Sequence, residues 1–119
     1  MKKLTKKEET IMDLFWEKGP MFLNDLREFY DEPKPHFNTL STQVRTLEAE
    51  GLIGHKTYGT TYQYFALVTS EEYNKSSLAN VISKYFDNSY LSAVSALVKE
   101  ERISVEELKE LITQIEKGE

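Results

Sequence analysis

Residues 37–50 of the chain, FNTLSTQVRTLEAE, decide how the rest of the sequence is interpreted. Apolar side chains recur there at the i, i+3, i+7 and i+10 positions, which share one face of a helix. Gly51 follows directly and is placed to end such a helix. The pattern therefore predicts a helix from about Phe37 to Glu50. Its inward face is expected to carry Phe37, Leu40, Val44 and Leu47.

The outward face of this predicted helix holds no acidic residue between Asn38 and Leu47. Its side chains are small hydrogen-bonding groups and one guanidinium, which suit contact with phosphates and base edges. Arg45 can pair with guanine and Asn38 with adenine. A polar face of this kind also occurs on solvated helices, so the helix alone leaves both interpretations open. The face comprises Asn38, Thr39, Ser41, Thr42, Arg45, Thr46 and Ala49.

The residues before this helix predict a helix, a short strand and a second helix. Thr5 and Glu8 have the spacing of a capping box, and Gly19-Pro20 stops the helix that they begin. Met21-Phe22-Leu23 is a short apolar run, and Asn24 can cap the second helix. The prolines that follow cannot continue that helix, because proline lacks the backbone N–H.

Two strands are predicted after Gly51, over Leu52–Tyr58 and Thr61–Val68, joined at Gly59-Thr60. Helix, short strand, helix, helix and hairpin is the order of a winged helix-turn-helix. In such modules the third helix enters the major groove and the hairpin contacts the backbone beside it. We therefore expect a mainly helical DNA-binding domain over residues 1–68. The expected DNA contacts are Lys34, Asn38, Thr39, Ser41, Thr42, Arg45, Thr46, His55, Lys56, Tyr58 and Thr60.

Residues 69–119 predict three further helices that form a dimerisation domain. Thr69 with Glu72 and Ser104 with Glu107 have capping-box spacing, and Asp87-Asn88-Ser89 separates the first two helices. The small module has little surface left to cover their apolar stripes, so self-association is the more economical use of them. Packing within one chain is the alternative. The expected dimer interface consists of Leu78, Val81, Ile82, Tyr85, Leu91, Val94, Leu97, Leu108, Leu111, Ile112 and Ile115.

The charge of the chain argues, at first, against a nucleic-acid partner. Its 119 residues carry a formal net charge of −5, whereas nucleic-acid-binding domains usually run basic. Residues 1–68 hold 9 Lys/Arg against 10 Asp/Glu, and residues 69–119 hold 6 against 10. The acidic excess therefore belongs to the tail, and the local field at the contact surface decides binding.

Composition excludes several classes of protein. The chain has no Cys, so it has no disulfide framework, thiolate metal site or cysteine nucleophile. His36 and His55 lack the spacing of a metalloprotease motif, and we expect no enzyme activity, metal or cofactor. No apolar stretch approaches the ~20 residues of a membrane span, and none follows the N-terminal lysines as in a secretory signal. The cytoplasm is the expected location.

Six stretches of the chain form an ordered set: TIMDLFW (10–16), NTLST (38–42), GLI (51–53), YQYF (62–65), SAVSALV (92–98) and SVEEL (104–108). Together they resemble the penicillinase-repressor (BlaI/MecI/CopY) family of winged-helix transcriptional repressors, over roughly residues 4–117. The resemblance implies a homodimeric repressor whose winged helix binds a palindromic double-stranded DNA operator. It also implies a helical tail that intertwines with the tail of the partner.

The resemblance further implies a mode of inactivation. In the antibiotic-responsive members, a membrane-bound sensor metalloprotease triggers cleavage in the penultimate helix, and by alignment the bond here is Ala96–Leu97. The family has Asn-Phe at that bond. It also has basic residues where Ser41 stands and near Thr46. Copper binding through tail cysteines, which other members use, is excluded in this chain because it has no Cys.

Two other functions stay open on the sequence alone. One is a winged helix that binds proteins and never contacts DNA, which the acidic balance favours. The other is a DNA-binding regulator that a small ligand releases, with no proteolysis.

Overall fold

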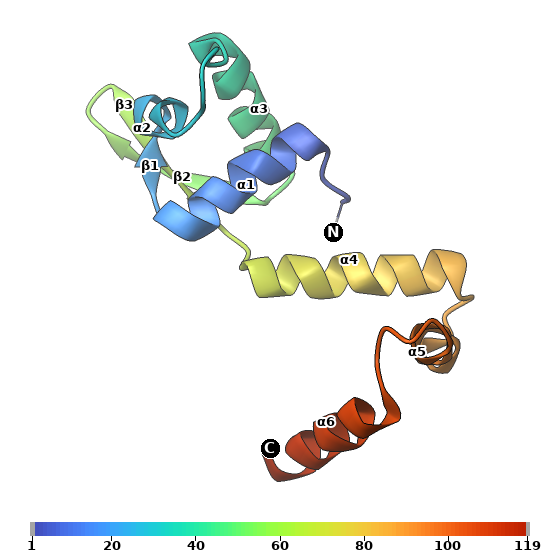
Figure 1. Cartoon of the computed structure of the whole chain (residues 1–119). Helices are drawn as coiled ribbons and strands as arrows, with labels where there is room; N and C mark the ends of the chain where they lie inside the picture. The colour runs from blue at the N-terminus through green and yellow to red at the C-terminus, as the bar shows by residue number, and fades with distance from the viewer. Residues whose placement is uncertain (1, 119) are drawn as a thin grey trace. The chain divides into compact units, whose positions relative to one another are not determined.

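The computed structural model describes the backbone of residues 2–118 and the side chains of residues 2–113. The chain forms two compact units, Met1–Ser76 and Ser77–Glu119. In the described residues, the first unit holds three helices, a small sheet and the start of a fourth helix (Figure 1). The described part of the second unit consists of helices and the loops between them.

The first unit follows the predicted order of helix, strand, helix, helix and hairpin. Its β3 strand lies between β1 and β2 and pairs antiparallel with both. This order confirms the expected fold class, a mainly helical chain with a small hairpin arranged as a winged helix-turn-helix. The elements are α1 (Lys6–Lys18), β1 (Met21–Phe22), α2 (Leu23–Glu28), α3 (Phe37–Ala49), β2 (Ile53–Tyr58) and β3 (Thr61–Ala66).

The inward face of α3 is the centre of the core of this unit. Leu40, Val44 and Leu47 are at most 1% exposed and belong to one apolar cluster with Ile11 of α1. The prediction that Phe37 also faces inward is wrong, because 44% of Phe37 is exposed. It stands in the first turn of α3, where it borders an open groove.

The start of α2 differs from the prediction as well. Asn24 does not cap this helix, which begins one residue earlier at Leu23. The N–H of Phe22, the residue before the helix, donates instead to Asp25 Oδ2 at 3.1 Å. A carboxylate inside the first turn therefore provides the hydrogen-bond acceptor for this backbone group. The chain therefore passes from β1 into α2 without a linker. The two hairpin strands are also shorter than predicted, since β2 begins at Ile53 and β3 ends at Ala66.

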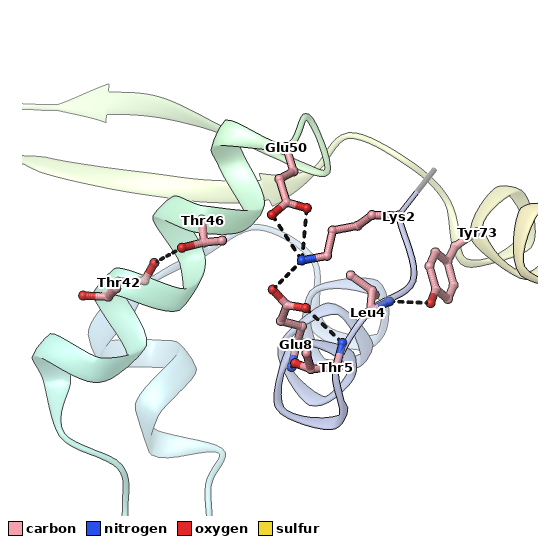
Figure 2. A network of polar contacts seen from close by, with 8 residues as sticks. All are labelled: Lys2, Leu4, Thr5, Glu8, Thr42, Thr46, Glu50 and Tyr73. Atoms are coloured by element: carbon pink, nitrogen blue, oxygen red, sulfur yellow. Dashed lines mark hydrogen bonds and ion pairs between the residues drawn. The ribbon is translucent and has the colours of Figure 1, made fainter.

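An N-terminal arm, residues 2–5, joins α1 to two distant parts of the first unit (Figure 2). The predicted capping box is present: Thr5 N–H donates to Glu8 Oε1 at 2.9 Å, and Glu8 N–H donates to Thr5 Oγ1 at 3.2 Å. Lys2 Nζ lies 3.1 Å from both the Glu8 and the Glu50 carboxylates, and Glu50 directly follows α3. Leu4 N–H donates to the hydroxyl of Tyr73 at 3.1 Å.

Three helices follow the hairpin, as predicted: α4 (Ser70–Tyr85), α5 (Tyr90–Lys99) and α6 (Val105–Gly118). Both predicted capping boxes are formed, by Thr69 with Glu72 and by Ser104 with Glu107. The indole N–H of Trp16 donates to the Val68 carbonyl at 2.9 Å, so α1 also holds the residues that lead into α4.

Apolar side chains are exposed along the three tail helices. Leu91 is 82% exposed, and no side chain of α5 is buried. Among the expected interface residues whose side chains are described, Ile82 alone is buried, with 5% of it exposed. No helix among the described residues is both long and apolar enough to cross a membrane. The exposed apolar residues of the tail include Leu78, Val81, Tyr85, Tyr90, Leu91, Val94, Leu97, Val105, Leu111 and Ile112.

The buried carboxylate of Glu8 makes the fold sensitive to acid. Burial raises the pKa of Glu8, but the hydrogen bonds from Thr5 and the contact with Lys2 outweigh burial, so the pKa lies below its ordinary value. A carboxyl whose pKa is lower in the folded than in the unfolded chain adds stability above its unfolded-state pKa. That stability is lost as the pH falls through the folded-state pKa.

We predict that Glu8→Gln lowers the free energy of unfolding by about 1 kcal/mol at about pH 7, because the ion pair and part of the cap are lost. The difference from wild type should shrink at a pH well below the ordinary pKa of a glutamate, because protonation of the wild-type carboxyl removes its contribution. Urea denaturation at the two pH values measures both effects. Glu9→Gln, an exposed neighbour, is the control and should change neither. An equal loss at both pH values would contradict the assignment.

Candidate nucleic-acid interface

The outward face of α3 presents the polar surface that its sequence predicts. Asn38, Thr39, Thr42, Arg45 and Thr46 are exposed, and Ser41 beside them is half-buried. The Thr46 hydroxyl donates to the Thr42 carbonyl at 3.0 Å. Arg45 Nε lies 3.4 Å from the Ser41 carbonyl, a long hydrogen bond, and no ion pair to Arg45 occurs within the described residues. The guanidinium therefore keeps donors available to a partner.

The hairpin of β2 and β3 turns at Gly59, whose φ of 59° is the positive value expected for this turn. Side chains alternate between the two faces of a strand. Lys56 and Tyr58 therefore lie on one face of β2, and the Lys56 ammonium sits 5.4 Å from the centre of the Tyr58 ring. The Phe22 ring of β1 packs edge-on against the Tyr58 ring, and the two ring centres are 5.7 Å apart. Thr60 is exposed at the turn.

The opposite face of the hairpin borders α3 across a groove of about 290 Å³, which we call the α3–hairpin groove. It includes three predicted contact residues, Ser41, Arg45 and Thr60. It also includes aromatic side chains that the prediction did not assign to the interface. Alternation along the predicted strand already places Tyr62 and Tyr64 on one face, but the face that borders α3 depends on how the hairpin packs against that helix. The groove is lined by Phe22, Leu23, Asn24, Phe37, Ser41, Arg45, Thr60, Thr61, Tyr62 and Tyr64.

A contact between a histidine and a carboxylate connects α3 with the hairpin. The Nδ1 atom of His55 on β2 contacts the carboxylate of Glu48 on α3. The Tyr62 ring stacks on the imidazole, with ring centres 4.2 Å apart, and the Tyr64 ring meets it edge-on at 5.8 Å. Burial raises the pKa of the Tyr64 hydroxyl, and the nearby Glu48 charge raises it further, whereas Arg45 lowers it. Glu48 and His55 are seven residues apart on different elements, so no sequence pattern predicts this pair.

Lys34 has a role within the module that the sequence did not indicate. Its ammonium donates to the carbonyls of Tyr30 at 2.6 Å and Glu28 at 3.1 Å, and lies 3.5 Å from that of Arg27. These carbonyls are at the end of α2, where a positive charge is favourable. The contact of Lys34 with DNA stays a prediction.

The tail carries the remaining predicted site residues. The Ala96–Leu97 bond lies inside α5, and the two carbonyls accept backbone hydrogen bonds from Glu100 and Arg102 at 3.1 and 3.0 Å. Leu108 is half-buried, and the side chain of Ile115 lies outside the described residues. Within the described part of the chain, no group of three or more His, Asp or Glu side chains is arranged to hold a metal ion.

Comparison with known proteins agrees with this architecture. The sequence profile of the penicillinase repressor family matches residues 4–117. The methicillin resistance regulatory protein MecI of Staphylococcus aureus strain N315 is 27% identical over 105 residues, covering 87% of this chain and 85% of the relative. The MecI protein of Staphylococcus epidermidis matches with the same identity and coverage. With nearly its whole length matched, this chain belongs to the penicillinase repressor family of transcriptional repressors.

Proposed function

We propose that this protein is a homodimeric repressor that binds a palindromic DNA operator through α3 and the hairpin. The acid-free, exposed face of α3 supports the proposal most directly. A helix of this diameter fits the major groove of B-DNA, where base edges distinguish all four base pairs. Arg45 supplies a fork of donors that pairs with guanine, and the Asn38 amide pairs with adenine.

The hairpin contributes contacts of another kind. Lys56 is a point charge that neutralises one phosphate, and Tyr58 and Thr60 offer hydroxyl groups to the backbone. Contacts to phosphates fix the position of a protein on the duplex but carry no sequence information. We therefore assign base recognition to α3 and backbone contact to Lys56, Tyr58 and Thr60.

The tail supports the dimer half of the proposal. Leu91, Leu111 and Ile112 are each more than half exposed, an arrangement typical of a surface that a partner covers. In a two-fold dimer the same surface is used by both copies, and the two α3 helices face two half-sites. In helix-turn-helix dimers these half-sites lie about 34 Å apart, one turn of B-DNA. Ile82 is already buried in the single chain and is expected to support this surface from within.

We predict that Arg45→Ala weakens binding to the operator at least about tenfold, since a bidentate contact to a base contributes about 1–3 kcal/mol. The operator is first obtained by selecting bound duplexes from a random pool, and affinities are then measured by fluorescence anisotropy. Lys56→Ala is the contrasting variant. It should weaken binding to all duplexes alike and reduce the slope of log K against log salt by about one phosphate contact.

Two outcomes would contradict the DNA part of the proposal. Unchanged operator affinity in Arg45→Ala would remove α3 from base recognition. Failure of the wild-type chain to retain any duplex would favour the alternative, a winged helix that binds proteins. The circular dichroism of both variants should match that of wild type, because Arg45 and Lys56 are exposed.

For the dimer, we predict that Ile112→Asp produces a monomer in sedimentation velocity, because it places a charge within the apolar surface of α6. Thr113→Asp is the matched control. It adds the same charge at the next residue, an exposed polar position, and should remain a dimer. If Ile112→Asp sediments as a dimer, the interface lies elsewhere.

We also propose that cleavage at Ala96–Leu97, triggered by a membrane-bound sensor protease, ends repression. Cutting there separates Leu97, Leu111 and Ile112 from the rest of the chain and removes part of the proposed dimer surface. The bond lies in a helix, so cleavage requires that α5 open locally. We expect mass spectrometry of the protein recovered from its host after antibiotic induction to find a fragment ending at Ala96. Derepression with only intact chain would favour release by a ligand instead.

A further inference from the structure

The His55–Glu48 pair is a titratable contact at the edge of the proposed DNA-binding surface. Glu48 follows the acid-free face of α3, and its side chain and that of His55 are both partly exposed. The titratable groups that meet the imidazole are Tyr62 and Tyr64 on β3, and the charges of Glu48 and Arg45 on α3 both act on the Tyr64 hydroxyl. Histidine is the type of side chain in this group that can change charge in the physiological pH range.

The charge of this pair depends on one proton. With a neutral imidazole, Nδ1–H can still donate to the Glu48 carboxylate, but the pair carries a net negative charge. With a protonated imidazole, the pair is neutral. A net negative charge beside the α3–hairpin groove repels the phosphates of a bound duplex, and a neutral pair does not.

We infer that His55 is a positioning residue that couples DNA binding to the uptake of one proton. The protonated imidazole neutralises Glu48 and ties the hairpin to α3, while the Tyr62 ring stacked on it fixes its plane. The inference rests on the proposed function, which it deepens by making the affinity of the repressor for DNA depend on pH.

The direction of the effect follows from linkage. A bound polyanion favours the protonated form of a nearby imidazole, so the complex binds more protons than the free protein and duplex do. Affinity for DNA therefore rises as the pH falls. DNA phosphates do not change charge near neutral pH, so the protein is the source of the dependence.

The test compares the affinity of three proteins for the selected operator duplex at about pH 6 and about pH 8, at fixed ionic strength. We expect wild type to bind roughly three- to tenfold more tightly at the lower pH, which corresponds to an average uptake of about a quarter to a half of a proton over this range. In His55→Gln this ratio should fall to about one, because the amide retains a donor but cannot take up a proton. His36→Gln is the matched control. It removes the other imidazole of the chain, next to α3, and should keep the wild-type ratio.

A second variant and a second measurement separate this role from a purely structural one. Glu48→Gln should bind the duplex more tightly than wild type at the higher pH. The ratio of its affinities at the lower and the higher pH should be smaller than that of wild type. Calorimetry in two buffers of different ionisation enthalpy should detect proton uptake on DNA binding by wild type and less uptake by His55→Gln. A structural role alone would weaken His55→Gln by the same factor at both pH values.

The outcomes distinguish this inference from the proposed function. If wild type binds the duplex but His55→Gln keeps the full pH dependence, the inference is overturned and the repressor proposal stands. A loss of the dependence in His36→Gln alone would also overturn it. If wild type binds no duplex at either pH, both the inference and the proposed function fall.

Discussion

The burial of one face of α3 is the constraint on which the rest of the first unit depends. Leu40, Val44 and Leu47 are almost fully removed from water against α1 and the sheet. Rotating the helix would expose these side chains, at a cost of about 1.5–3 kcal/mol each. The same contacts therefore hold the polar face outward. The capacity of the chain to present Asn38, Thr42 and Arg45 together is a consequence of apolar packing on the other side of the helix.

Local sequence patterns predicted the elements of this protein well, because the interactions that define them are local. Capping boxes such as those of Thr5 and Ser104 involve residues three positions apart, and the positive φ of Gly59 is a property of one residue. The expected cap of α2, Asn24, is wrong because the helix begins at Leu23, and the carboxylate of Asp25 inside its first turn accepts from the Phe22 N–H.

The features that could not be predicted join residues that are brought together only by folding. The contact of Glu48 with His55 needs the angle between α3 and the hairpin, and the role of Lys34 needs the path of the loop back to the end of α2. Phe37 illustrates a limit of periodicity. Spacing identifies the face of a helix on which a side chain lies, but not whether another element extends far enough to cover it.

The N-terminal arm has a consequence for the synthesis of the protein. Lys2 and Leu4 leave the ribosome well before the groups that they contact, Glu50 and Tyr73. The hydrogen bond from the Leu4 N–H can form only when the chain has been made as far as the first turn of α4. A nascent chain that ends after the hairpin holds all the residues of α3 and the hairpin but lacks the partner of the Leu4 N–H. The first unit can therefore finish folding during translation only after Tyr73 has left the ribosome.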